Sequence, residues 1–433
     1  MTRNERIAAW VCGLFAAAMR WPALSLTPWD WDEALFALAL RDYDVTQHHP
    51  HPPGFPLFIA LAKLVPLGEF HALQAVTFVA SLFVFPAMFF LARELGATPF
   101  VAMAAALLLS FFPNVWFYGG TAFSDVPSLV LVLVACALLL RGRRSDRALI
   151  AGAIALGIAA GFRPQNLLIG FAPFVLAFLQ RRRTAMIAAC ITAAIVIASF
   201  GTAAMLSGGF DAYREALAKH ERFIRATDSF LSEIRPWLPQ VADDFFFRPF
   251  RAPAINIAIA LLALIGFVKR RKWIAIAMFA PFLLFAWLFL DFHSASRFSI
   301  GYMPLYALLA AEGLPSRGRF ASLAALATLL VVWTWPALRV VHTTPSPPFA
   351  ALRAANGPVV YVDDRLAAHA ALLLPNVERR IVRVTPQLQL PAGSVLVREG
   401  ASTAPGAKHF ARTRDRLEGI ARARYFDCAV IER

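Results

Sequence analysis

The sequence predicts an all-α protein that crosses a membrane many times and carries a small α/β domain at its C-terminus. Of its 433 residues, 59% are hydrophobic and only 16% are charged, whereas about 25% of a typical soluble chain is charged. The hydrophobic residues gather in long runs up to residue 340, and shorter strand-like segments follow. A soluble core cannot absorb this excess, because a chain must also cover its own surface with polar groups.

Eleven apolar runs approach the length of about 20 residues that a spanning helix needs. They lie at 7–26, 70–92, 99–116, 125–140, 148–162, 167–180, 184–206, 253–268, 273–290, 299–314 and 320–340. The first run lacks a small-residue cleavage pattern, so we expect a retained helix and no signal peptide. Segment 54–67 is short and contains Pro56 and Pro66. We therefore expect it to lie at the membrane surface or to re-enter without crossing.

Basic residues orient these spans. With the N-terminus in the cytoplasm, the cytoplasmic loops carry sixteen Lys or Arg residues against three acidic ones, as the positive-inside rule requires. Twelve spans with the N-terminus outside would misplace only Arg3 and Arg6, and this arrangement remains the alternative. The net charge of +15 thus reflects orientation, and we expect no nucleic-acid partner. The expected location is a bacterial inner membrane.

Three segments then share the extracytoplasmic face. The transmembrane domain is expected to cover 1–340, with outer loops at 27–69 and 208–252. The second loop has seven basic and seven acidic residues, which is typical of a solvated helix. The tail at 341–433 has strand-like segments at 358–364, 379–384, 394–399 and 425–432, with helical patterns near 365–373 and 412–422. It predicts a soluble extracytoplasmic α/β domain.

Ionisable residues are costly at membrane depth and therefore informative. In this sequence they collect on the outer side, in the first loop and between later spans. In chain order they are Asp32, Glu33, His48, His49, His51, Asp125, Arg163, His293 and Arg297. Carboxylates and cations on one membrane face are what a site for an anionic, lipid-embedded substrate needs.

An ordered series of short motifs carries these residues. The series is DE at 32–33, HPPGFPLF at 51–58, SDVP at 124–127, GFRPQN at 161–166 and HSASRFSIGYMPLYALLAA at 293–311. It resembles the polyprenyl-phosphate-dependent glycosyltransferases of the GT-C fold, in particular bacterial relatives of protein O-mannosyltransferases and lipid A aminoarabinose transferases. The resemblance covers residues 1 to about 315, and the tail resembles no family that we can name.

The resemblance implies roles for individual residues. Asp32, beside Glu33, takes the position of the catalytic carboxylate, and Asp125 takes that of a second carboxylate. Arg297 takes the position of the cation near the lipid phosphate, with Arg163, His51 and His293 as further phosphate contacts. Some relatives have a lysine where His51 stands, so a phosphate contact there would depend on protonation.

The chemistry of the residues agrees with these roles. Sugar transfer from a lipid phosphate needs a base on the acceptor hydroxyl and a cation on the leaving phosphate. The released monoester has a second pKa of about 6, so it can leave as an anion without a general acid. Asp32 as base would give one displacement and inversion. The sequence identifies no cofactor, although His48, His49 and His51, with Asp32 and Glu33, could hold a divalent cation.

Simpler readings and other functions remain open. Asp32, Glu33 and Asp125 could cap helix N-termini, Arg163 and Arg297 could be interfacial anchors, and the histidines could be solvated loop residues. The alternative functions are a transporter or flippase of a lipid-linked glycan and a non-catalytic envelope assembly protein. The sequence contains no Walker loop or dinucleotide motif. The expected partners are a polyprenyl-phosphate sugar donor, an acceptor lipid, glycan or protein, and membrane lipids.

Overall fold

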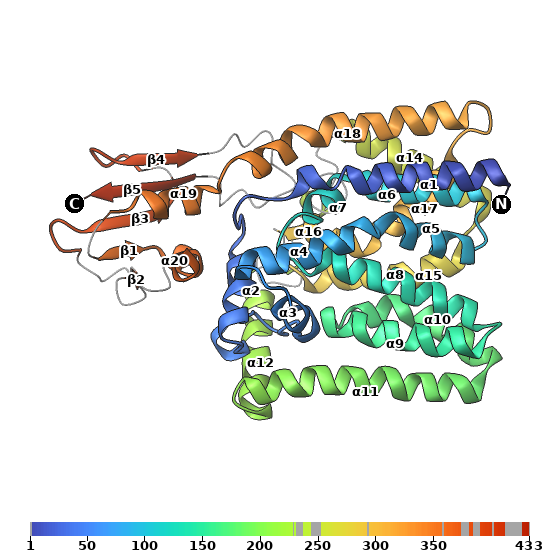
Figure 1. Ribbon diagram of the computed structural model, residues 1–433, viewed down its shortest axis with the longest axis horizontal. Helices are drawn as coiled ribbons and strands as arrows, with labels where there is room; N and C mark the ends of the chain where they lie inside the picture. Colours follow the sequence, from blue (N-terminus) through green and yellow to red (C-terminus); the bar gives the residue numbers. More distant parts are fainter. Residues whose placement is uncertain are drawn as a thin grey trace.

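The computed structural model describes residues 2–432 except 228, 231–236, 244–252, 292–293, 357–358, 374–380, 384–389, 401 and 412–426. Figure 1 shows a bundle of roughly parallel and antiparallel helices with a small sheet domain at one end. The helices of the bundle are α1 (Arg3–Ala18), α4 (Glu69–Leu82), α5 (Val84–Glu94), α6 (Pro99–Phe111), α7 (Pro113–Tyr118), α8 (Asp125–Gly142), α9 (Asp146–Phe162), α10 (Asn166–Gln180), α11 (Arg182–Leu206), α14 (Pro253–Arg270), α15 (Trp273–Phe289), α17 (Met303–Gly313) and α18 (Arg319–Thr343).

Every predicted apolar run contains helix, but four of the runs are divided: those at 7–26 (α1 and η1, Trp21–Ala23), 70–92, 99–116 and 299–314 (η6, Ser299–Tyr302, and α17). The run at 70–92 divides into α4 and α5, which are bent by 42°, and the run at 99–116 divides into α6 and α7. Among the described residues, three helices are long and apolar enough to cross a membrane, or four when the bent pair counts as one. α6, with 13 residues, is only about 20 Å long at 1.5 Å per residue. The count of eleven spans therefore stays a prediction.

Short helices cover the end of the bundle nearest the sheet domain. They are η1 (Trp21–Ala23), α2 (Trp31–Arg41), η2 (Val45–Gln47), α3 (Pro56–Lys63), α12 (Phe210–Thr227), α16 (Ala295–Phe298) and η6 (Ser299–Tyr302). α13 (Leu238–Ala242) follows α12 in the chain, and α19 (Pro347–Ala354) packs on the sheet. α3 has eight residues, so it is about 12 Å long and cannot cross a hydrocarbon core of about 30 Å. This length agrees with the expectation for segment 54–67.

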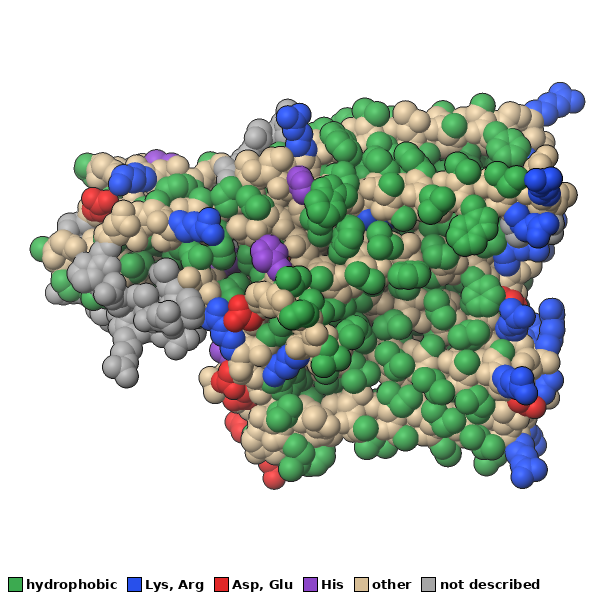
Figure 2. All heavy atoms as spheres, viewed as in Figure 1, with side chains coloured by type: hydrophobic (Ala, Val, Ile, Leu, Met, Phe, Trp, Pro, Cys, Tyr) green, Lys and Arg blue, Asp and Glu red, His purple; other side chains and the backbone are tan. Residues whose placement is uncertain are grey.

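Charge and hydrophobicity divide the surface into zones. Figure 2 shows a broad hydrophobic belt around the bundle, with Lys and Arg gathered at the end where the N-terminus lies. The acidic side chains visible in this view lie mostly at the opposite end, beside α2 and α12. This segregation is what a membrane-embedded bundle with one basic face requires.

The tail forms a five-stranded sheet with its own core. Its strands are β1 (Val360–Val362), β2 (Ile381–Arg383), β3 (Val395–Glu399), β4 (Lys408–Ala411) and β5 (Asp427–Glu432), in the order β2-β1-β3-β5-β4. β1 pairs in parallel with β2 and β3, whereas β5 runs antiparallel to β3 and β4. The four predicted strands are present. β4 was not expected, and the helix predicted near 412–422 lies outside the described residues.

α20 (Ala367–Leu373) joins the sheet domain to the bundle, with Ala368 and Leu372 packed into the core of the bundle. The Arg41 guanidinium at the end of α2 donates to the carbonyl oxygens of Ala371 and Leu372, at 3.1 and 3.0 Å. These carbonyls belong to the last turn of α20, which follows the short helix η7 (Asp364–Leu366). Because unpaired carbonyls at a helix C-terminus attract cations, α20 is held against α2. Arg41 also pairs with Glu69 at 2.6 Å.

Candidate active site

The site begins at the N-terminus of α2. Asp30 is the N-cap, and its side chain accepts a hydrogen bond from the Asp32 amide at 3.0 Å. Glu33 completes the capping box and is fully buried, with its carboxylate accepting from the amides of Trp29, Asp30 and Ala122 at 2.7, 3.0 and 2.9 Å. Burial raises the pKa of Glu33 to about 7. Of the two acidic residues considered as helix caps, Glu33 therefore has the capping role. The Asp32 side chain makes a different contact.

That contact is an ion pair with Arg297. The Arg297 guanidinium donates to an Asp32 carboxylate oxygen at 2.7 Å, although the two residues are 265 positions apart in the chain. Arg297 lies on α16, buried over the rings of Phe123 and Phe298, at 4.5 and 4.8 Å from their centroids. The Asn114 side-chain amide holds α16 by donating to the Ser296 carbonyl and the Ser299 hydroxyl, each at 3.0 Å.

A second ion pair lies close by. Arg163 directly follows the last residue of α9, and Asp125 is the first residue of α8. The Arg163 guanidinium donates to the Asp125 carboxylate at 2.6 Å. It also donates to the Ser124 hydroxyl at 3.0 Å. Both partners of the pair are almost completely buried. A small cavity of about 20 Å³ is lined by Asp125, Arg163 and Arg297, so the two ion pairs face a common space.

The loop between α7 and α8 links the two ion pairs. Its Ala122 amide holds Glu33, and its Phe123 ring lies beneath Arg297. From α4, Gln74 donates to the Gly120 carbonyl at 2.9 Å and Thr77 donates to the Phe123 carbonyl at 2.9 Å. A side chain at Gly120 would collide with the backbone of η1. Because packing fixes this loop on both sides, it sets the relative position of the two pairs.

His51 stands next to Asp32, with Nδ1 at 3.7 Å from a carboxylate oxygen. Burial lowers the pKa of His51 to about 3, against the opposing effect of Asp32 and together with the charges of Arg297 and Arg163 and the neighbouring His220. At neutral pH the ring is therefore uncharged. It can donate or accept a hydrogen bond, but it adds no positive charge to the site.

This lowered pKa predicts a pH dependence of stability. As the pH falls below 6.5, the unfolded chain takes up a proton on His51 before the folded chain does, so acid favours unfolding. The contribution of neutral His51 to the free energy of unfolding is fully present above pH 6.5 and is lost as the pH falls toward about 3. We expect the melting temperature of His51→Asn to fall less steeply with acid than that of the unsubstituted protein. Parallel melting curves over this pH range would contradict a neutral, buried His51.

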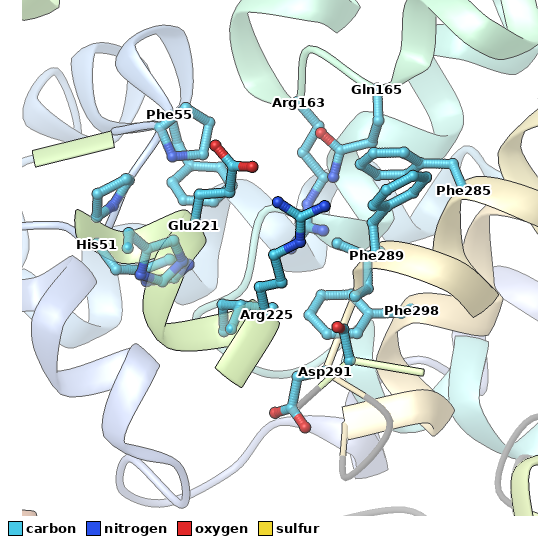
Figure 3. A pocket seen from close by; sticks show the side chains of 16 residues that line it. His51, Phe55, Arg163, Gln165, Glu221, Arg225, Phe285, Phe289, Asp291 and Phe298 are labelled. Atoms are coloured by element: carbon cyan, nitrogen blue, oxygen red, sulfur yellow. The ribbon is translucent and has the colours of Figure 1, made fainter. Parts of the chain in front are cut away.

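A larger cavity of about 400 Å³ opens beside His51 (Figure 3). Its polar lining residues are His51, Arg163, Gln165, His220, Glu221, Arg225, Ser229 and Asp291, and its apolar ones include Phe55, Phe285, Phe289, Leu290 and Phe298. In Figure 3 the Arg225 side chain extends from α12 across the cavity toward Arg163 and Gln165. The cavity thus joins a polar part, with two arginines and the two carboxylates Glu221 and Asp291, to an aromatic part. Its arginines can contact an anionic head and its rings a hydrocarbon tail.

Sequence reasoning missed the contribution of α12, which was interpreted as a solvated helix. Its residues His220, Glu221, Ile224 and Arg225 line the cavity, and their spacing of one, four and five positions places them on one helical face. This face carries one isoleucine among polar and charged side chains, and that mixture was the only sign in the sequence that the face is partly buried. The equal numbers of acidic and basic residues in the loop did not reveal this face, because net charge does not show which side of a helix is buried.

Two other predicted groups have different outcomes. His293 lies outside the described residues. His48 and His51 each lie with their rings 6.0 Å from that of His220, but the described residues contain no group of three His, Cys, Asp or Glu side chains arranged to hold a metal ion.

Solved structures with the same fold are known, although no family model and no curated protein matches the sequence. ArnT from Cupriavidus metallidurans bound to undecaprenyl phosphate aligns with a TM-score of 0.57 and 12% identity, over 99% of this chain and 98% of ArnT. The apo form of ArnT aligns with a TM-score of 0.53 over 97% of each chain, also at 12% identity.

A third solved structure is the apo oligosaccharyltransferase of Archaeoglobus fulgidus. It aligns with a TM-score of 0.55 and 12% identity over 87% of this chain, and the chain spans 64% of its length. At such low identity these likenesses establish the architecture only. They confirm that the chain has the GT-C fold, as its motif series indicated.

Proposed function

We propose that this GT-C-fold chain transfers a sugar from a polyprenyl-phosphate donor to an acceptor hydroxyl on the extracytoplasmic face of the membrane, with inversion. The observation that carries the proposal is the Asp32 carboxylate, which lies 2.7 Å from Arg297 and 3.7 Å from His51. His51 in turn lines a cavity with two arginines and several aromatic rings. The ArnT neighbour was solved with undecaprenyl phosphate, which supports a donor of this class.

In the proposed reaction Asp32 is the general base. It takes the proton of the acceptor hydroxyl as the acceptor oxygen attacks the anomeric carbon, and the bond from that carbon to the phosphate oxygen breaks. The polyprenyl phosphate leaves as an anion and needs no proton donor. One displacement at the anomeric carbon inverts its configuration. Arg297 holds the carboxylate in place, and Glu33 positions the helix that carries it.

The donor phosphate needs a cation whose charge is not already matched. Arg163 is paired with Asp125 and Arg297 with Asp32, while His51 is neutral. Arg225 lines the same cavity and makes no ion pair with any residue that the structure describes. We therefore place the phosphate between Arg225 on α12 and Arg163 on the opposite wall (Figure 3). The rings of Phe285, Phe289 and Phe298 would receive the first isoprene units.

The test is sugar transfer by the purified protein from a labelled polyprenyl-phosphate donor, with Arg225→Gln as the variant. Removing a charge-assisted hydrogen bond costs about 1.5–3 kcal/mol, so we expect KM for the donor to rise about tenfold or more with a small change in kcat. Arg222→Gln is the matched control, because Arg222 is exposed on the same helix and does not line the cavity.

Two results would contradict the proposal. Equal KM values for the Arg225 and Arg222 variants would remove Arg225 from the phosphate site. Movement of the labelled donor across vesicles containing the protein, without sugar transfer to any acceptor, would favour the transporter alternative.

A further inference from the structure

A second cavity of about 400 Å³ lies on the outside of the bundle, between α1 and the bend where α4 meets α5. It is almost entirely apolar. Its walls include Ala9, Trp10, Gly13 and Leu14 from α1 and Phe83 and Phe85 from α4–α5. Trp10, Leu14 and Phe83 are more than half exposed. We call this cavity the α1 groove.

Two local features create the α1 groove. The 42° bend between α4 and α5 turns the second helix away from the line of the first. On the opposite wall Gly13 lets α1 lie close to this helix and form the floor of the groove, because a Cβ atom there would stand only 3.2 Å from the Phe85 ring. Because the groove-lining residues of α1 recur three and four positions apart, from Arg6 to Ala17, they form one continuous stripe along the helix.

The length of this stripe corresponds to one leaflet. Eleven residues separate Arg6 from Ala17, which is about 16 Å at the helical rise of 1.5 Å per residue. The hydrocarbon core of a bilayer is about 30 Å thick, so the groove extends over about half of it. An acyl chain of a single leaflet would fill it, whereas a spanning helix from another protein would extend well beyond it.

The charge of the α1 groove is concentrated at one end. Among the described residues, Arg6 is its one ionisable lining residue and is exposed. It lies near the start of α1, at the end of the bundle that carries the N-terminus (Figure 1) and where Lys and Arg gather (Figure 2). Membrane-proximal basic residues attract anionic lipid headgroups with about 1 kcal/mol each. The groove thus combines an apolar channel of acyl-chain length with a cation where a lipid phosphate would lie.

We propose that the α1 groove binds one anionic phospholipid from the leaflet at the Arg6 end, with an acyl chain along α1 and the phosphate against Arg6. This ligand is not the donor of the reaction, because the donor phosphate lies at Arg163 and Arg225, toward the other end of the bundle. The lipid would fill the space left by the α4–α5 bend and support the packing of α1.

Native mass spectrometry of the detergent-purified protein tests this proposal, with phosphatidylglycerol and phosphatidylcholine as the added lipids. We expect one phosphatidylglycerol to bind in preference to phosphatidylcholine. Arg6→Gln should weaken its binding about fivefold, which corresponds to about 1 kcal/mol. Arg183→Gln, an exposed arginine on α11 outside the groove, should leave the binding unchanged.

A second pair of variants tests the apolar part of the groove. Ala9→Phe should fill the groove and abolish binding of this lipid, and Ala194→Phe on the exposed face of α11 should retain it. If Ala9→Phe fails to fold, Arg6→Gln still decides the proposal. Equal lipid retention by Arg6→Gln and Arg183→Gln would overturn it. A lipid-free dimer that Ala9→Phe dissociates would also overturn it, since a second copy of the chain would then occupy the groove.

Discussion

Asp32→Asn is expected to lower the rate of sugar transfer by a factor of about 10² to 10⁴, the usual contribution of a general base. Asparagine keeps the size of the side chain and can still accept a hydrogen bond from Arg297, but it cannot take a proton from the acceptor hydroxyl. The measurement is transfer from a labelled polyprenyl-phosphate donor by purified protein, with donor binding measured separately. We expect kcat to fall and donor affinity to change little.

Two neighbouring carboxylates provide controls for Asp32. Asp30→Asn should retain both the helix cap and the activity, because asparagine caps as well as aspartate does. Glu33→Gln replaces an acceptor oxygen by a donor opposite backbone amides. It should reduce the free energy of unfolding by about 1–3 kcal/mol while the folded fraction keeps turning over. Near-normal transfer by Asp32→Asn would exclude Asp32 as the base.

Arg163→Met is expected to destabilise the fold by about 3–5 kcal/mol, because it leaves the Asp125 carboxylate buried without its partner. The pair is 2.6 Å long, and its side chains are only 7% and 4% exposed. Methionine fills a comparable volume without the charge. The measurement is the loss of folded protein with temperature or denaturant, alongside the transfer rate, which should also fall because Arg163 lines the donor cavity.

The double variant Arg163→Met, Asp125→Asn separates the two roles of the pair. Removing the orphaned charge should restore most of the lost stability, since an ion pair replaced as a whole costs far less than one that is broken. Transfer should not recover, because the cation on the cavity wall is still missing. A double variant as unstable as Arg163→Met would show that the unpaired Asp125 carboxylate is not the main cause of the lost stability. Full recovery of transfer would remove Arg163 from the donor site.

Several features of the fold could be predicted from the sequence because their causes are local. The apolar runs form helices, the tail forms strands where β-branched residues alternate, and segment 54–67 is too short to cross. The motif series indicated the GT-C fold, which the structural likenesses confirm. The breaks at Phe83 and Phe112 were not predicted, because hydropathy is averaged over a window and does not register where a helix bends.

The candidate site was predictable as a set of residues but not as a set of contacts. Charge and span order predicted that Asp32, Asp125, Arg163 and Arg297 lie on one face of the protein, and the structure brings them together in two neighbouring ion pairs. The partner of each carboxylate did not follow from the sequence, and neither did the different environments of Asp32 and Glu33, which are adjacent in the chain. The same is true of Arg225, which enters the cavity only because α12 packs over loop 27–69.

The sequence by itself determined which segments are apolar, which are basic and in what order the chemistry-bearing residues occur. Only the tertiary structure decided that Arg297 pairs with Asp32 and Arg163 with Asp125, and that a neutral His51 stands between the ion pairs and the cavity. Hydrophobic burial depends on the amount of apolar surface and tolerates imprecision. An ion pair or a hydrogen bond is made or lost within about 1 Å, and distances of that size are set by packing across the whole bundle.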